Sequence, residues 1–472
     1  MLNRILMSPV TPSFGPTRMA VQAISPALER KSLSARKWML GLAAVAGLTF
    51  AAAVVALIVT RSERYEVIQT FAAVGHGAKV PMGLTVDKVG NLYGTTWTGG
   101  LGGWGTIFEL VPPSFLGSRW ENRILSNVDG RTIGTGPIWS MIGQDGDLYG
   151  VTSDDETLYK FKFSDRGWGE PIPLYRFAER LSPLGTALPE LMSDTSGSLY
   201  GATTGRDGAD AGTVFKLSPG QDGWTMTVLH RFGGDNDGAY PNGGLAMDRT
   251  GALYGTTSGG GKDGIGTVFK LTPTDHGWEE SVIHTFRQLD GSSCYGGCLP
   301  VAGLTLATDG TLYGTTGAGG KFGGGVVFSL TPSGSGGWSQ QVLYNFKREV
   351  GDGQVPNSRL VFGRFGAIYG TTKSGGDRPD TNGFGTVFKL VPTATGWREV
   401  VLHCFAGAAD GGAPTGTLIR DASGNVFGTT QGRARSGAPN NGTVFEIVAG
   451  GAFSEPDPRS PTGPIQLIPH AP

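Results

Sequence analysis

The chain has 472 residues, with 38 Lys and Arg side chains against 39 Asp and Glu side chains, and 80 of its residues are glycine. This balance excludes a broad basic surface, so no nucleic-acid partner is expected. With 39% hydrophobic and 10% aromatic residues, the chain has the composition of a folded protein with many tight turns and not of a disordered glycine-rich linker.

The N-terminal part differs from the rest of the chain. Residues 1–37 carry six basic side chains and one acid, which predicts a flexible cytoplasmic tail. Residues 38–60 have no charge and are numerous enough for a helix to cross a membrane core of roughly 30 Å, so we expect a transmembrane signal anchor with everything after Arg61 exported. The alternatives are a signal peptide cleaved near Ala51–Ala53, which would release a secreted protein, and a buried soluble helix.

From residue 61 to residue 450 the chain repeats itself. An aromatic–glycine pair, mostly within the string LYGTT, recurs seven times. The copies are Tyr93-Gly94, Tyr149-Gly150, Tyr200-Gly201, Tyr254-Gly255, Tyr313-Gly314, Tyr369-Gly370 and Phe427-Gly428. Each period reads as four short strands separated by Gly, Asp, Asn or Pro, with no helical pattern. The sequence therefore predicts an all-β, seven-bladed propeller of four-stranded antiparallel blades.

The sequence contains one outermost strand too few for seven blades, unless a strand from the start of the repeat region completes the last blade. A Trp-led strand appears only six times, at Trp120, Trp168, Trp224, Trp278, Trp338 and Trp397, and the last copy ends after GTVFEIV (442–448). The segment Tyr65–Phe71 has the same pattern and stands before the first blade. We expect it to pair with residues 442–448 and to close the ring, which removes the open sheet edges.

Recurring residues belong to the scaffold on this interpretation. The tyrosine of LYGTT is expected to wedge between neighbouring sheets, and the glycine to let another backbone approach closely.

The repeat LYGTT…GG…GTVFKL-P…GW…VLH-F…DG resembles the GloVer repeat, found in choice-of-anchor tandem repeat GloVer-containing proteins. The resemblance covers about residues 65–450, although the second copy, LYGVTSDDETLYKF, departs from it. It implies an exported repeat protein of undefined activity whose membrane attachment varies among members. The Pro-rich tail 451–472 has no apolar anchor, so attachment in this chain would use residues 38–60.

Function is sought where the copies differ, in the Gly-rich connections between the second and third strands of each blade. We expect these connections and those between successive blades to share one face, with aromatic and charged side chains around a shallow funnel suited to a sugar polymer or a peptide. The candidate ligand-binding residues are Trp97, Trp104, Arg206, Asp207, Phe322, Asp377, Arg378, Phe384 and Arg433. Solvated loop tips are the alternative interpretation of each.

Other polar residues are interpreted as structural. Asp237, Asp352 and Asp410 each begin a D-G-x-x-P connection, where turn chemistry explains the carboxylate; calcium is an alternative, but no metal site and no cofactor are predicted. His230, His284 and His403 occupy one repeat slot, and no catalytic motif is present, so catalytic residues stay unknown. Cys294 and Cys298 are candidates for a local disulfide in an oxidising exterior, and Cys404 for a buried apolar residue.

These observations favour a membrane-tethered, exported propeller that binds carbohydrate or another surface protein without catalysis. A polysaccharide-active enzyme with acids on the loop face is the first alternative, and a structural envelope protein is the second. An enzyme predicts converging carboxylates with perturbed pKa values, whereas a binding module predicts exposed aromatic side chains without such a pair.

Overall fold

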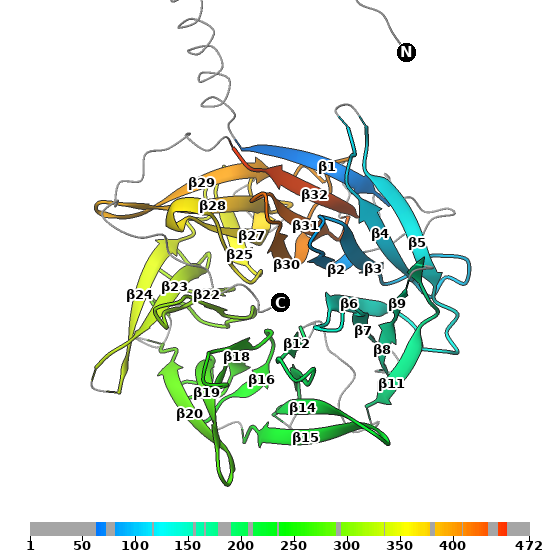
Figure 1. Ribbon diagram of the computed structural model, residues 1–472. Helices are drawn as coiled ribbons and strands as arrows, with labels where there is room; N and C mark the ends of the chain where they lie inside the picture. Colours follow the sequence, from blue (N-terminus) through cyan, green and yellow to red (C-terminus); the bar gives the residue numbers. More distant parts are fainter. Residues whose placement is uncertain are drawn as a thin grey trace, which may run out of the picture. The chain divides into compact units, whose positions relative to one another are not determined.

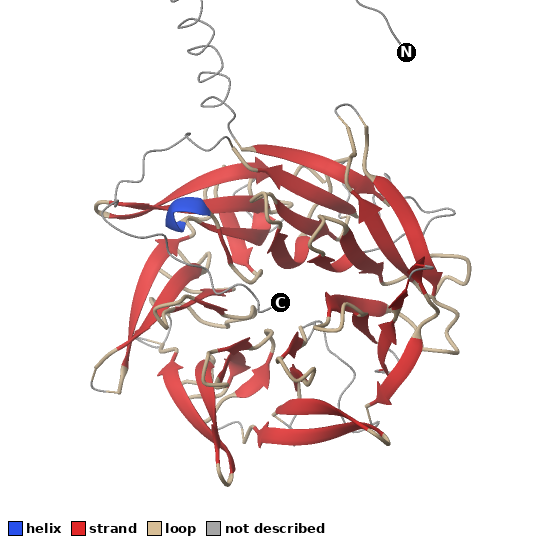
Figure 2. Ribbon diagram, in the orientation of Figure 1, coloured by secondary structure: helices blue, strands red, loops and turns tan. Residues whose placement is uncertain are grey.

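The computed structural model describes residues 63–71, 81–115, 118–153, 157–164, 167–177, 190–205, 211–233, 236–288, 294–334, 336–377, 383–407, 409–432 and 442–450. The predicted anchor at 38–60 lies outside these residues. Within them, no helix has the length and apolar character to span a membrane. Seven antiparallel sheets surround a common centre, as predicted (Figure 1). Strands make up nearly all of the regular structure, and the described residues contain one short 3-10 helix, η1 (Arg364–Gly366), drawn in blue in Figure 2.

The blades follow one another along the chain, and the order of strands within each blade runs from the inside of the ring outward. Blades 1 to 3 comprise β2 (Pro81–Val86), β3 (Leu92–Thr96), β4 (Thr106–Val111) and β5 (Glu121–Asn127); β6 (Pro137–Ile142), β7 (Leu148–Thr152), β8 (Thr157–Phe161) and β11 (Ile172–Arg176); and β12 (Met192–Ser193), β13 (Leu199–Thr203), β14 (Thr213–Gly220) and β15 (Gly223–Arg231). Blade 2 also carries a small hairpin of β9 (Phe163–Ser164) and β10 (Gly167–Trp168). Trp168 therefore lies in this hairpin and not in the outer strand, where the sequence pattern places it.

The remaining blades repeat the arrangement, with the inner strand split in two in blades 4 and 6. They comprise β16 (Ala239–Pro241) and β17 (Ala246–Met247), β18 (Leu253–Gly259), β19 (Thr267–Thr274) and β20 (Gly277–Thr285); β21 (Thr305–Leu306), β22 (Leu312–Thr316), β23 (Val326–Pro332) and β24 (Trp338–Asn345); β25 (Gly353–Pro356) and β26 (Val361–Phe362), β27 (Ile368–Gly375), β28 (Thr386–Thr393) and β29 (Gly396–Cys404); and β30 (Pro414–Arg420), β31 (Val426–Thr430), β32 (Thr443–Val448) and β1 (Arg64–Thr70).

The predicted closure of the ring is confirmed. β1 pairs antiparallel with β32, with Tyr65 opposite Ile447 and Thr70 opposite Thr443, so the seventh blade takes its outer strand from the start of the described chain. Just before β1, the Glu63 carboxylate accepts a hydrogen bond from Lys389 Nζ at 3.0 Å and another from the Tyr369 hydroxyl. Backbone pairing thus joins the two ends of the ring in blade 7, and the mostly buried ion pair of Glu63 with Lys389 ties the residue before β1 to blade 6.

Among the residues that the structure describes, the core consists of seven apolar clusters, one at each interface between neighbouring blades. Phe286 at the end of β20, for example, packs on Phe328 of the next blade with ring centroids 5.4 Å apart. Every blade buries apolar surface only against its neighbours, which is why a single blade could not fold alone.

The glycine of the LYGTT string serves a different purpose from the one predicted. A Cβ on Gly255 would stand 2.4 Å from Phe269 Cζ and 3.1 Å from Leu245 Cδ2, and Gly94 and Gly428 face Phe108 and Phe445 in the same way. The glycine therefore makes room for the phenylalanine ring of the adjacent strand within its own blade, not for another backbone.

Candidate functional site

The two ends of the strands form two surfaces with different chemistry. We define the loop face as the end of the strands that carries the connection after each LYGTT strand, such as 97–105 in blade 1. The turn face is the opposite end, which carries the turn before each LYGTT strand, such as 87–91.

Two predicted residues come together on the loop face between blades 1 and 2. Trp97 and Trp104 stand in the β3–β4 connection and are 44% and 49% exposed. The Trp97 indole Nε1 donates to Ser153 Oγ at 3.1 Å, and the Trp104 carbonyl accepts from the Gly136 amide at 3.0 Å. A Cβ on Gly136 would lie 2.5 Å from Trp97 Nε1, so only glycine lets the indole lie over this connection.

The other predicted residues are dispersed. Phe322 is exposed in a loop of blade 5, with Lys321 Nζ 5.3 Å from its ring centroid, and Asp377 is exposed in a loop of blade 6. Phe384 contradicts its prediction as a surface residue: it is 7% exposed and packs in the cluster between blades 6 and 7, under Gly407. Arg206, Asp207, Arg378 and Arg433 lie outside the described residues.

The two cysteines of the long connection before blade 5 lie next to each other as free, buried thiols. Burial and a hydrogen bond with Cys294 raise the pKa of the Cys298 thiol to about 12. A disulfide between them stays a prediction.

The aspartates of the D-G-x-x-P connections support local backbone. The Asp410 carboxylate accepts from the Ala406 amide at 2.9 Å and lies 2.9 Å from His403 Nε2. Asp237 holds Gly233 and His230 in the same manner, which agrees with turn chemistry and with a framework role for these histidines. Within the described part of the chain, no group of three His, Cys, Asp or Glu side chains could hold a metal ion.

One pair of carboxyl groups has the perturbed pKa values expected of an enzyme, but not the position expected of a catalytic pair. Glu399 and Asp352 flank the Tyr344 hydroxyl, which donates to Glu399 Oε2 at 2.7 Å and lies 3.1 Å from Asp352 Oδ2. Burial, then the Asp352 charge, raises the pKa of Glu399 to about 7. Burial and Asp237 raise the pKa of Glu280, in the equivalent slot of blade 4, to about 7 as well. Because the arrangement recurs between blades, we interpret it as framework.

On the turn face, a second polar network recurs beside the repeat tyrosines of blades 1 to 4. In blade 4 the Tyr254 hydroxyl donates to Asp248 at 2.9 Å, and Lys270 Nζ lies 5.6 Å from the tyrosine ring centroid. Lysines occupy the equivalent position in blades 2, 3 and 6. They are Lys160, Lys216 and Lys389, at 5.5, 5.3 and 5.7 Å from the respective tyrosine rings.

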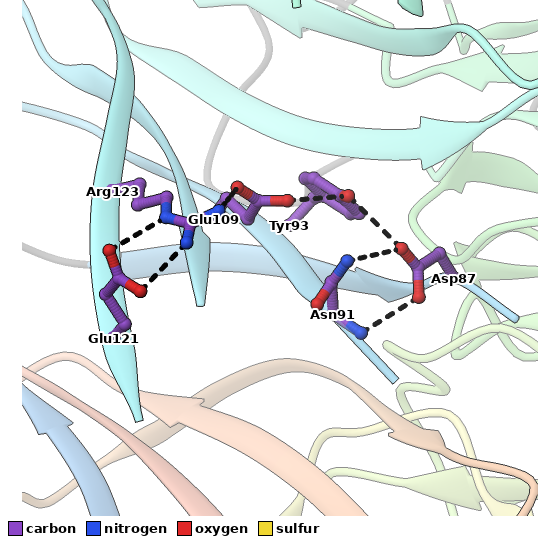
Figure 3. A network of polar contacts seen from close by, with 6 residues as sticks. All are labelled: Asp87, Asn91, Tyr93, Glu109, Glu121 and Arg123. Carbon is purple, nitrogen blue, oxygen red and sulfur yellow. Dashed lines mark hydrogen bonds and ion pairs between the residues drawn. The ribbon is translucent and has the colours of Figure 1, made fainter. Parts of the chain in front are cut away.

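Blade 1 replaces this lysine by an acid and supplies the cation from the next strand (Figure 3). Glu109 accepts from the Tyr93 hydroxyl at 2.9 Å, and Arg123 of β5 lies 3.6 Å from Glu109 while bonding Glu121 at 2.8 Å. Asp87 takes the usual aspartate position beside Tyr93.

Two clefts open where the lysine is missing without such compensation. One, of about 820 Å³, lies between blades 7 and 1, where Glu446 stands in the lysine slot. The other, of about 470 Å³, lies between blades 5 and 6, where Ser329 does so. Sequence reasoning missed both, because it looked for function only in the loops. The signal was a substitution inside the scaffold, GTVFEI and VVFSLT where blades 3, 4 and 6 read GTVFKL.

Comparisons with known proteins identify the repeat. A family model described as the Gloeobacter/Verrucomicrobia repeat matches residues 157–380 and 301–456. No curated protein matches the chain. Among solved structures, virginiamycin B lyase from Staphylococcus aureus is similar at 14% identity and a TM-score of 0.49, covering 82% of this chain and 100% of the lyase. The extracellular domain of a hybrid two-component system from B. thetaiotaomicron is similar at 12% identity and a TM-score of 0.48, covering 82% of this chain and 41% of that one.

Proposed function

This chain belongs to the Gloeobacter/Verrucomicrobia repeat family, and from its fold and its exposed tryptophans we propose that it is an exported binding propeller without catalytic activity. The carbohydrate or surface protein that it binds would dock on the loop face between blades 1 and 2. The observation that carries this proposal is the pair Trp97 and Trp104, each about half exposed, with the Trp97 indole and the Trp104 backbone carbonyl hydrogen-bonded to neighbouring connections.

The physical argument rests on what an anchored, exposed indole offers. Its flat apolar face is available for stacking while its position is already fixed, so a ligand orders little on binding. Exposed large aromatic side chains that gather at one place commonly mark a binding surface. The apolar faces of sugar rings fit the anchored indole of Trp97 and the exposed indole of Trp104, and we therefore favour a polysaccharide ligand.

Two alternatives are an enzyme and a structural envelope protein. The pair of Asp352 and Glu399 has the raised pKa values that an acid catalyst needs, but the equivalent slots of other blades contain similar groups. A structural envelope role would need neither the indoles nor the acids.

The test is a polysaccharide array probed with the full-length protein, in which both binding and released fragments are measured. We expect saturable binding without fragments, and at least about tenfold weaker binding after Trp97→Ala or Trp104→Ala, since truncated aromatic anchors cost most at binding surfaces. Phe163→Ala, which removes another exposed aromatic ring on the β9–β10 hairpin, is the matched control and should bind as wild type. Released fragments would support the enzyme, and an array on which nothing binds would leave protein partners or a structural role.

The tether is proposed from the uncharged residues 38–60. After expression in a bacterium, we expect the protein in the membrane fraction, with the propeller labelled by a membrane-impermeant amine reagent. Release into the medium with a new N-terminus near residue 53 would instead identify a cleaved signal peptide, and a cytosolic protein would contradict both.

A further inference from the structure

The charge of the cleft between blades 7 and 1 depends on one residue of the repeat, which is a lysine in four other blades. In blades 2, 3, 4 and 6 a lysine pairs in register with the framework tyrosine, and its ammonium group lies beside that ring. The ammonium group also pairs with an aspartate of the turn in blades 2 and 3, and with Glu63 in blade 6. Lys160, for example, bonds Asp147 at 2.9 Å and lies 3.6 Å from Asp145. Four of the seven blades thus have a cation at this position of the turn face.

Blade 7 has an acid there, and a second acid opposite. Glu446 pairs in register with Phe427, as the lysines pair with the tyrosines. On the other side, Glu446 stands directly across from Glu66 of β1. In blade 1 the equivalent cross-strand pair is Glu109 with Arg123, which compensates the acid. Like charges directly opposite each other on neighbouring strands are unfavourable. Glu446 has no cation in register with it on either neighbouring strand, whereas Glu109 of blade 1 has Arg123.

The lining of the cleft is acidic and aromatic around this point. Glu446 is 7% exposed, and the nearby Trp120 indole favours its charged form. The Trp120 ring lies 5.8 Å from the Phe427 ring, edge to face. The charged side chains that line the cleft are Glu66, Asp87, Asp421, Glu446, Lys88 and Arg119. Four acids against two bases leave the cleft negative, and exposed Arg64, outside the lining, pairs with Glu66.

We propose that the cleft between blades 7 and 1 binds a primary alkylammonium group, such as the side chain of a lysine in a peptide, between Glu446, Glu66 and Asp421. The bound ammonium takes the place that the chain's own lysines take in four other blades. The adjoining indole of Trp120 provides the aromatic face that a cation favours. With about 820 Å³, the cleft has room for the alkyl chain and part of the molecule that carries it.

The cleft between blades 5 and 6 serves as an internal comparison. It also lacks the lysine, but its lining contains one acid, Asp309, and neutral Ser329 and Gln341 in the slots of Glu446 and Glu66. It is smaller, at about 470 Å³, and among its described lining residues no pair of acids faces it across the strands. The proposal therefore applies to the first cleft alone.

The test measures binding of a fluorescent tetralysine peptide to the full-length protein, with its Nε-acetylated form and 1,5-diaminopentane as further probes. We expect Glu446→Lys, which introduces the residue found in blades 2, 3, 4 and 6, to weaken binding of tetralysine about tenfold or more. Ser329→Lys fills the other cleft and should leave binding unchanged, as should Trp97→Ala on the loop face. Glu446→Gln, which keeps the shape of the side chain, should also weaken binding and covers the case that the lysine variant does not fold.

The probes distinguish the sources of the ammonium group. Competition by 1,5-diaminopentane at similar concentration would indicate recognition of a free amine, and competition only by peptide would indicate a lysine side chain. Equal binding of the acetylated peptide, equal binding by Glu446→Lys, or no binding of either amine would overturn the proposal. Because Trp97→Ala separates the two faces, failure at the turn-face cleft leaves the loop-face proposal intact, and the reverse holds.

Discussion

Blades 4 and 7 share one strand register but are completed in opposite ways. Blade 4 is continuous in sequence, and Lys270 fills the polar slot beside Tyr254. Blade 7 borrows its outer strand from the start of the ring and has Glu446 in that slot beside Phe427. The apolar packing positions are kept in both blades, whereas the charge at the polar position is reversed. This comparison shows that the repeat constrains the volume of its apolar side chains more tightly than the charge at the polar position.

The largest effect is expected from a variant that tests whether β1, which closes the ring, contributes as much to stability as the outer strand β20 of blade 4. Phe71→Ala removes a side chain that is buried between blades 7 and 1, where it packs on Phe108 at 5.1 Å. We expect the free energy of unfolding in urea to fall by about 3–5 kcal/mol, because a large cavity remains. Phe286→Ala makes the same change in blade 4, so a much smaller loss for Phe71→Ala would mean that β1 is only loosely attached.

A smaller effect is expected from the glycine of the repeat. In Gly255→Ala the added methyl group meets the Phe269 ring, which cannot move far in a packed blade. We expect a loss of about 1–3 kcal/mol in urea unfolding. Gly428→Ala meets Phe445 in the same way in blade 7 and should cost a similar amount. Variants as stable as wild type would show that the phenylalanine relaxes and that the glycine is not required for packing.

The smallest effect concerns pH. Burial, with Glu66 and Asp421, raises the pKa of Glu446 to about 7, whereas an unfolded glutamate titrates near 4.5. The folded state therefore binds more protons between these values, and this group makes the protein less stable as the pH rises from about 4.5 to about 7, with no further change above. The Glu446 side chain itself is buried, but the cleft that it lines is open to solvent, which screens part of its charge and reduces the effect.

Urea midpoints at pH 5 and pH 8 measure this difference. Glu446→Gln should reduce the fall in stability between the two pH values. The same slope in wild type and Glu446→Gln would mean that Glu446 is ionised throughout.

The sequence was sufficient for the architecture because the repeat is nearly literal. Seven aromatic–glycine pairs predict the number of blades, and the absence of a seventh Trp-led strand predicts the role of residues 65–71. The same pattern could not tell exposed from buried side chains in the Gly-rich loops. Phe322 and Phe384 occur in similar stretches, but only Phe384 finds a pocket, under Gly407 of the following connection.

The turn-face cleft could be predicted only in part. That Glu446 replaces a lysine is visible in the sequence, but its meaning depends on what stands across the strand. Glu66 comes from the other end of the repeat region, so the opposition of two acids appears only when the register of β1 and β32 is known. Arg123, which compensates the charge of Glu109 in blade 1, is likewise placed opposite that residue only by the strand register.

The closing strand also imposes an order on events in the cell. The Tyr65 hydroxyl bonds the Asp410 carbonyl, 345 positions later in the chain, so β1 has no partner until almost the entire propeller has been synthesised. Contacts between such distant segments form slowly, and an unpaired strand can join the wrong partner in the meantime. During biogenesis, therefore, the segment next to residues 38–60 is the last part of the ring to gain its native neighbours, and it is the part that a chaperone would need to protect longest.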